Sequence, residues 1–307
     1  MGAGGECRRI EPVFFKQNNS AIAVKPLLCA RRAQLLAIYY HGRLPEKRKR
    51  SIPTMAAEVY SLFSSSKGNS CLVKNGGDLF LIDAGVSAKR IRAAMQKCGF
   101  APEQLQAIFI THEHSDHIGG LDTLCRQVGV PVYIPSPCYE HIRHRAPSAE
   151  PFLRCNDPGN VVELAQTRVL AVQTPHDACG SVGFRIDLSG EIMAYFTDIG
   201  HLSQKVVSAM SGCARVVIES NHDLSMLWNG PYPELLKQRI AGEYGHLSNE
   251  MCAKLLAHLP DYGTKRVLLA HLSEENNTPG LALAAAKEAL CGRAEAAVAA
   301  PDGIVEV

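Results

Sequence analysis

Short apolar runs that lead into an acidic residue or a histidine recur along most of the chain. Runs at 79–82, 107–110, 169–172, 192–196, 216–218 and 267–270 are rich in branched and aromatic residues, and they predict buried strands. Each run is followed closely by one such polar residue; these are Asp83, His112, His176, Asp198, Glu219 and His271. Open α/β sheets bind their ligands at the carboxyl ends of strands. We therefore expect six chemically active side chains to gather at one edge of a layered sheet.

The stretches between these runs predict turns and helices. A strand at 59–63, a polar turn at 64–70, a strand at 71–73 and a hairpin turn at 75–78 open the pattern, and a second hairpin turns at Ser189-Gly190. Another strand is expected at 130–134, and 138–159 is a polar connection. Apolar residues at helical spacing predict helices over 87–98, 118–128, 232–241, 248–259 and 279–290. Ser87, Ser115 or Asp116, and Ser248 are suitable N-caps for three of them. Strands alternating with helices in this way favour a four-layered αββα sandwich.

The first 54 residues differ from the rest of the chain. Residues 1–54 contain eleven Lys and Arg against three Asp and Glu, a net charge of +8, whereas residues 55–307 carry a net charge of −6. Their apolar stretch at 21–40 is interrupted by charges and a proline, which argues against a signal peptide. We expect 1–54 to be a basic extension, disordered or outside the fold, and 55–307 to be the folded domain. The alternatives for 1–54 are a basic arm that binds nucleic acid and an organelle-targeting presequence.

Composition places the chain among soluble globular proteins. Hydrophobic residues make up 46% and charged residues 20%, and no apolar run is long enough to span a membrane. The eleven cysteines are an odd number without a Cys-x-x-Cys pair, which predicts free thiols and a cytoplasmic protein. An acidic body is unusual for a nonspecific nucleic-acid binder, although bound metal ions would reverse the local charge. Nothing in the sequence sets the oligomeric state.

The run Thr111-His-Glu-His-Ser-Asp-His117 carries the strongest chemical signal. It places His112, His114, Asp116 and His117 on one turn between a strand and a helix. Neutral imidazoles and carboxylates are the preferred ligands of zinc, and a site containing carboxylates also suits manganese. The alternative is a polar loop with incidental histidines, which the crowding of four such groups after a buried strand disfavours.

This motif, with the strand ends around it, resembles the metallo-β-lactamase fold from about Val59 to the C-terminus. Within this fold the chain most resembles the YycJ (WalJ) family. The resemblance rests on the opening strand, the Ser-rich turn and Asp83-Ala-Gly, and on the motifs Glu219-Ser-Asn-His222-Asp and His271-Leu-Ser-Glu-Glu-Asn-Asn. The resemblance implies two divalent ions, Zn²⁺ or Mn²⁺, with His112, His114 and His176 on one ion. It places Asp116, His117 and His271 on the other, with Asp198 bridging both. Asp83 is expected to hydrogen-bond the histidine loop, with Gly85 permitting a tight turn.

Three further residues are candidates for catalysis together with Asp116. Glu219, His222 and His246 occupy places where the phosphodiesterase branch of the fold carries additional acidic and histidine residues. A protonated histidine there would bind a phosphate oxygen or protonate the leaving group. For each histidine a purely structural, hydrogen-bonded role is the alternative. His141 and His144 are expected at the surface or in contact with substrate.

The resemblance implies a two-metal phosphodiesterase that uses a hydroxide held between the ions. Within it, the YycJ-like motifs imply a 5′-to-3′ exonuclease acting on double-stranded DNA, with nucleic acid as the partner and no membrane. One alternative is a thioester or lactone hydrolase like glyoxalase II, which uses nearly the same ligands. A second is a non-catalytic metal-binding sensor, which the presence of all seven ligands disfavours.

Overall fold

The computed structural model describes residues 16–17, 20–21 and 56–307. The chain divides into two compact units, Met1–Thr54 and Met55–Val307. In the first unit, β1 (Lys16–Gln17) and β2 (Ser20–Ala21) form an antiparallel pair. The predicted extension at 1–54 falls mostly outside the described residues, so it stays a prediction.

Two seven-stranded sheets form the second unit. The first sheet has the order β16 (Val305–Glu306), β3 (Glu58–Phe63), β4 (Ser70–Asn75), β5 (Asp78–Ile82), β6 (Ala107–Phe109), β7 (Val132–Ile134), β8 (Leu153–Cys155). The second has the order β15 (Glu295–Val298), β14 (Arg266–Ala270), β13 (Arg215–Glu219), β12 (Glu191–Phe196), β11 (Val182–Leu188), β10 (Thr167–Gln173), β9 (Val161–Glu163). The strands predicted from the apolar runs are therefore present, and short strands are added at the edges of both sheets.

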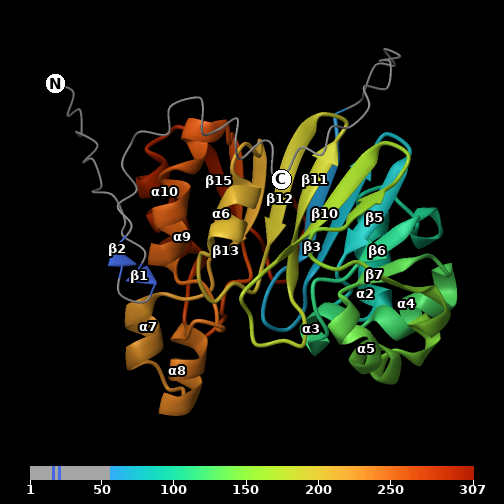
Figure 1. Ribbon diagram of the computed structural model, residues 1–307, viewed down its shortest axis with the longest axis horizontal. Coiled ribbons are helices and arrows are strands. Elements are labelled where there is room, and N and C mark those ends of the chain that lie inside the picture. Colours follow the sequence, from blue (N-terminus) through green and yellow to red (C-terminus); the bar gives the residue numbers. More distant parts are fainter. Residues whose placement is uncertain (1–15, 18–19, 22–55) are drawn as a thin grey trace. The chain divides into compact units, whose positions relative to one another are not determined.

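The two sheets face each other and bury a core between them (Figure 1). Aromatic rings join the layers; Phe109 of the first sheet lies edge-on to Phe184 of the second, with ring centroids 5.8 Å apart. The outer face of the first sheet is covered by α2 (Ala88–Lys97), α4 (Leu121–Val128) and α5 (Tyr139–Arg145). The outer face of the second is covered by α6 (Gln204–Met210), α9 (Asn249–Leu256) and α10 (Pro279–Leu290). The predicted αββα sandwich is confirmed.

Parallel pairing brings the reactive strand ends to one edge. In the first sheet β5 and β6 are parallel, with Ile82 opposite Phe109, so Asp83 and the histidine loop leave side by side. In the second sheet β12, β13 and β14 are parallel, so Asp198, Glu219 and His271 follow neighbouring strand ends. Within each sheet this register gathers five of the six expected residues, whereas His176 follows β10, which pairs antiparallel with β11.

The histidine loop differs from the prediction in its helix. One helix over 118–128 was expected, but α3 (Ser115–Ile118) and α4 are separated at Gly119 and Gly120. The glycines allow close packing, because a Cβ on Gly120 would lie 2.0 Å from the carbonyl oxygen of Val86. The N-cap of α3 is His114, so the prediction of Ser115 or Asp116 was wrong.

Of the other two predicted N-caps, Ser248 forms its capping hydrogen bond and Ser87 does not. Ser87 stands at the N-cap of α2, yet its side chain accepts no capping hydrogen bond. Ser248 caps α9 as predicted, with its hydroxyl accepting from the Met251 backbone N–H. The first cap therefore contributes less to helix stability than its residue type predicts.

Several short elements were not anticipated from the sequence. The connection at 138–159 contains α5 and β8, and α6 and α7 (Leu224–Asn229) were also missed. The helix expected at 232–241 begins at Glu234, as α8 (Glu234–Ala241). Elements this short bury few apolar residues; α5 buries only Ile142, which leaves no periodicity to detect. Among the described residues, no helix is both long and apolar enough to cross a bilayer.

Candidate metal centre

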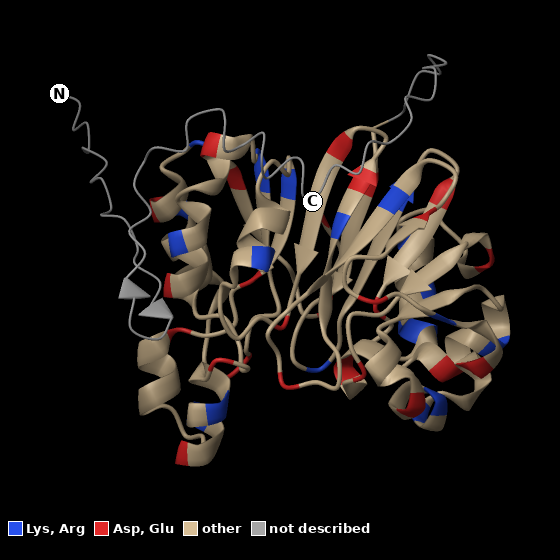
Figure 2. Cartoon of the chain, viewed as in Figure 1, with Lys and Arg blue, Asp and Glu red and all other residues tan. Residues whose placement is uncertain are grey.

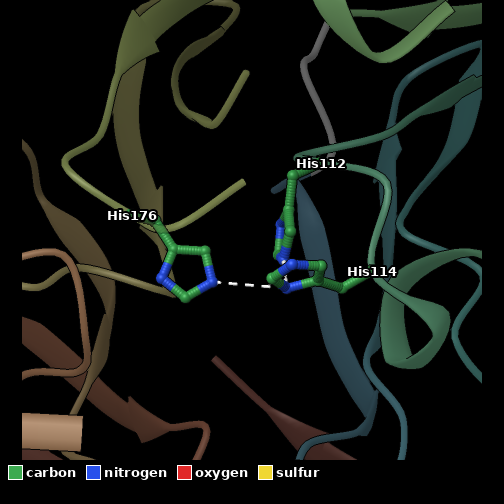
Figure 3. A group of neighbouring side chains, drawn as sticks. All are labelled: His112, His114 and His176. Carbon is green, nitrogen blue, oxygen red and sulfur yellow. Dashed lines mark hydrogen bonds between the residues drawn. The ribbon is translucent and has the colours of Figure 1, made fainter. Parts of the chain in front are cut away.

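Three histidine rings converge from the two sheets. His112 and His114 lie on the loop after β6, and His176 follows β10 of the opposite sheet. His112 Nε2 lies 3.0 Å from His114 Nδ1, and His176 Nε2 lies 3.4 Å from the same atom (Figure 3). Each ring offers a nitrogen within 4.8 Å of the others, which is the arrangement of a three-histidine metal site.

A second donor group lies beside the first. Asp116 Oδ2 is 3.3 Å from His117 Nε2 and 3.5 Å from His271 Nε2. His117 is fully buried, and His271 is buried as well. One carboxylate and two imidazoles from both sheets thus face a common point.

Asp198 lies between the two donor groups. Its Oδ2 is 3.3 Å from His117 Nε2, and its Oδ1 is 3.7 Å from His176 Nε2. It also lies close to both His112 and His271. A carboxylate in this position contacts residues of both donor groups.

Two buried carboxylates orient the imidazoles. Asp83 accepts from His117 Nδ1 at 2.8 Å, and it holds the loop through the Thr111 backbone N–H, also at 2.8 Å. Glu219 accepts from His271 Nδ1 at 2.7 Å. Each contact fixes the proton on Nδ1 and leaves Nε2 free to donate its lone pair to a cation. The predicted contact between Asp83 and the histidine loop is present.

Three residues at the site adopt left-handed backbone conformations. Asp83, Asp198 and His271 have φ values of 61°, 56° and 55°. This region is uncommon for residues other than glycine, and holding a side chain there costs on the order of 1–3 kcal/mol. All three follow strand ends, so the turned backbone directs their side chains toward the shared edge.

Burial and charge together determine the protonation of the cluster. Burial opposes a charge on His271, but Asp198, Asp116 and Glu219 outweigh it and raise its pKa to about 10. The pKa of His117 is raised in the same way, because the carboxylates again outweigh burial. Burial lowers the pKa of His112, and the neighbouring His117 adds to this effect. Divalent cations would replace the protons on His117 and His271, so metal binding releases protons.

The donor atoms fit divalent metal ions. Asp198 Oδ2 and His271 Nε2 are buried, yet neither has a hydrogen-bond partner in the described part of the chain. Buried polar atoms are rarely left without a partner, because the lost hydration is costly. Cations facing these atoms would satisfy both, and the mixture of imidazole nitrogen and carboxylate oxygen suits Zn²⁺ or Mn²⁺.

The three additional catalytic candidates occupy different positions. His246 is one-fifth exposed at the rim, its Nδ1 donates to Glu219 Oε1 at 2.9 Å, and its ring centroid is 5.2 Å from that of His176. Glu219 is fully buried and also accepts from the backbone N–H groups of Ile199 and Leu247. His222 is buried with an unpartnered Nδ1, and it belongs to none of the donor groups found among the described residues.

Sequence reasoning missed some residues that contact the centre. The Asn69 amide lies 3.2 Å from His117 Nε2, and the Ser64 hydroxyl accepts from the His271 backbone N–H. Glu113, between two predicted ligands, accepts from the Cys179 backbone N–H and so ties the histidine loop to the His176 loop. The Ser-rich turn at 64–70 was the sequence feature that could have indicated the contacts of Ser64 and Asn69. His141 and His144 are exposed on α5, outside every donor group of the described chain.

Comparison with known proteins agrees with this architecture. Residues 79–272 match the family described as "Beta-lactamase superfamily domain". Exodeoxyribonuclease YycJ of Bacillus anthracis is 34% identical over 72% of this chain and 84% of its own length. Exodeoxyribonuclease WalJ of Streptococcus pneumoniae is 33% identical over 73% of this chain and 84% of its own. The metallo-β-lactamase fold protein YhfI of Bacillus subtilis superposes with a TM-score of 0.61 at 16% identity, covering 82% of this chain and 99% of that one. The chain is therefore a metallo-β-lactamase-fold hydrolase and belongs to the family of YycJ and WalJ.

Proposed function

We propose that the chain is a two-metal phosphodiesterase that degrades double-stranded DNA from the 5′ end. Two named exodeoxyribonucleases share a third of their residues with it over most of their length. The observation that carries the proposal is the position of Asp198, which lies between two complete donor groups. Paired divalent ions are an established means of cleaving phosphodiesters, because they stabilise both the attacking and the leaving oxygen.

The donor groups overlap, one of them joining Asp198 and His271 to Glu219 and His246, and we assign seven of the residues to two sets with one shared member. His112, His114 and His176 would hold one ion, Asp116, His117 and His271 the other, and Asp198 would contact both. Bound divalent ions supply an activated water and neutralise charge that develops on the phosphate oxygens. Asp83 and Glu219 act by fixing the tautomers of His117 and His271. Replacing Asp198 with Ala should therefore lower metal content and abolish hydrolysis together.

His246 is the candidate for contact with the phosphate or the leaving group. Glu219 fixes its Nδ1, so its Nε2 faces the partly open rim beside His176. If it acts as charge develops, His246→Ala should lower kcat about 10²–10⁴-fold with a smaller effect on KM. Metal content should be unchanged, and the melting temperature should fall only by the effect of one lost hydrogen bond to the Glu219 carboxylate. His258→Ala, an exposed histidine beyond the other end of α9, is the matched control.

Activity should be tested with protein loaded with zinc or with manganese. The substrates are a 5′-phosphorylated duplex labelled at either end and S-lactoylglutathione. We expect the 5′-terminal label to be released first, with the thioester untouched. Thioester hydrolysis without DNA cleavage would favour the glyoxalase II-like alternative, and tight metal binding without turnover on either substrate would favour the sensor.

A further inference from the structure

A guanidinium group lies at the rim of the metal centre. Arg239 on α8 donates through Nε to Asp177 Oδ2 at 2.5 Å, and Asp177 directly follows the candidate ligand His176. The Arg239 side chain is 58% exposed. Its two terminal nitrogens have no hydrogen-bond partner among the described residues, so one edge of the guanidinium group is fixed and the other is open.

The segment that carries Arg239 is attached to the centre at several points. Figure 1 shows α7 and α8 extending beyond the sandwich at the lower edge, where α3 also lies. Lys237 donates to the Trp228 carbonyl oxygen at 2.8 Å and thereby ties α8 to α7. The Asp177 backbone N–H donates to the Tyr244 carbonyl oxygen at 3.0 Å, which ties the end of the segment to the His176 loop. Arg239 is therefore held in place beside the metal centre.

Two exposed aromatic side chains lie on the same segment as Arg239. Tyr244 is 59% exposed and Trp228 is 44% exposed. Stacking surfaces beside a cationic group are the means by which proteins hold nucleic-acid strands without reading their sequence. Figure 2 shows basic residues on α8 and none on α7, within a body whose net charge is negative. Asp177 offsets part of the Arg239 charge, so its attraction for a polyanion acts at the open edge of the guanidinium group.

We propose that Arg239 binds a backbone phosphate of the DNA strand next to the scissile phosphate, with Tyr244 against the adjoining nucleotide. This inference rests on the proposed function and names the residues that hold its substrate. Asp177 occupies Nε and leaves the fork of Nη1 and Nη2, which is the geometry that matches two phosphate oxygens. Lys67, an exposed cation on the Ser-rich turn at 64–70, is already paired with Glu274.

The simpler alternative is that Arg239 only stabilises the loop through Asp177. Exposed ion pairs contribute little to stability, so this role predicts a small change in melting temperature and no change in DNA affinity. The test compares metal-loaded full-length protein with Arg239→Ala, Arg239→Lys and the control Arg126→Ala. Arg126 is matched to Arg239, since it is 61% exposed and also paired with an aspartate, Asp122.

Steady-state kinetics on a 5′-phosphorylated duplex at several salt concentrations separate the two roles. We expect Arg239→Ala to raise KM about 10- to 100-fold, the usual effect of one charged hydrogen bond. The slope of log KM against log salt should fall by about one, as for one lost phosphate contact. Relative to Arg239→Ala, Arg239→Lys should restore the salt slope more fully than it restores KM. Lysine keeps the positive charge but lacks the two parallel N–H donors of the guanidinium group. The loss should be smaller on bis(p-nitrophenyl) phosphate, which has no neighbouring phosphate.

Each outcome decides between the hypotheses. If Arg239→Ala cleaves DNA with the same KM and the same salt slope as Arg126→Ala, this inference is overturned and the proposed function is left intact. An equal loss on DNA and on the small diester would also overturn it, because the effect would then lie in the metal centre. A parent protein that cleaves neither substrate would refute the proposed function and this inference with it.

Discussion

Glu219→Gln tests how the metal centre is organised. The Glu219 carboxylate accepts four hydrogen bonds, from the Nδ1 atoms of His271 and His246 on one oxygen and from the backbone N–H groups of Ile199 and Leu247 on the other. Glutamine has the same shape but replaces one acceptor with an N–H donor. Two of the four donors must therefore lose their acceptor, whichever way the amide is turned.

Both orientations of the amide have a predictable cost. If the amide nitrogen faces the two backbone N–H groups, two buried donors are left unsatisfied. If it faces the imidazoles, His271 must accept on Nδ1 and carry its proton on Nε2, where it can no longer bind a cation. Losing two hydrogen bonds to a charged group costs roughly 3 kcal/mol or more, which is about 6–12 °C in Tm for a domain of this size. Metal affinity should fall about 10- to 100-fold.

The assay is thermal melting of the metal-free protein together with metal titration. Asp78→Asn is the matched control, because Asp78 is also a fully buried carboxylate that accepts from two backbone N–H groups, those of Ala165 and Gln166. Asp78 stands at the start of β5, away from the centre, so its substitution should lower Tm without changing metal affinity. If Glu219→Gln changes Tm but binds metal as tightly as Asp78→Asn does, the orienting role of Glu219 is refuted.

Four further outcomes follow from the structure and composition. Gly85→Ala should abolish stable folding or lower Tm sharply, because a Cβ there would lie 1.7 Å from the Asp116 carbonyl oxygen; a normal melting curve would contradict this contact. Chelation should lower Tm, and adding metal back should restore it, as measured by calorimetry. Protein that starts at Met55 should fold and retain its activity, which solubility and DNA affinity at moderate salt would check. In thiol titration Cys155, which is exposed, should react before Cys252, whose burial raises its pKa to about 12; equal rates would show that the α9 core opens readily.

The sequence predicted the sandwich and the shared edge because strand ends are marked by residue type. Asp83, His112 and Asp198 each follow a buried apolar run, and parallel pairing then aligns such ends. The division between α3 and α4 was missed although the Gly119-Gly120 pair is a local signal for a break; what the sequence does not reveal is the close contact of Gly120 with Val86. Gly85 was expected to permit a tight turn, but the residue with positive φ is Asp83, and Gly85 is needed for close packing.

The sequence predicted which side chains lie close together at the candidate site, but it did not predict how they are arranged. Which oxygen of Asp198 faces which histidine depends on how the sheets pack, and no local pattern encodes that. The contact of Asn69 with His117 arises across two loops, so the Ser-rich turn alone could not reveal it. Arg239 stands in a short amphipathic helix like many others, and only its contact with Asp177 distinguishes it.

The distribution of donors over both sheets gives the ions a mechanical role. His112 and His117 belong to one half of the sandwich, whereas His176 and His271 belong to the other. An ion bound by both halves acts as a cross-link that closes a very long loop, comparable in its entropic effect to a disulfide. Loss of metal would remove that cross-link and lower the free energy of unfolding, while the buried core between the sheets would still hold the two halves together.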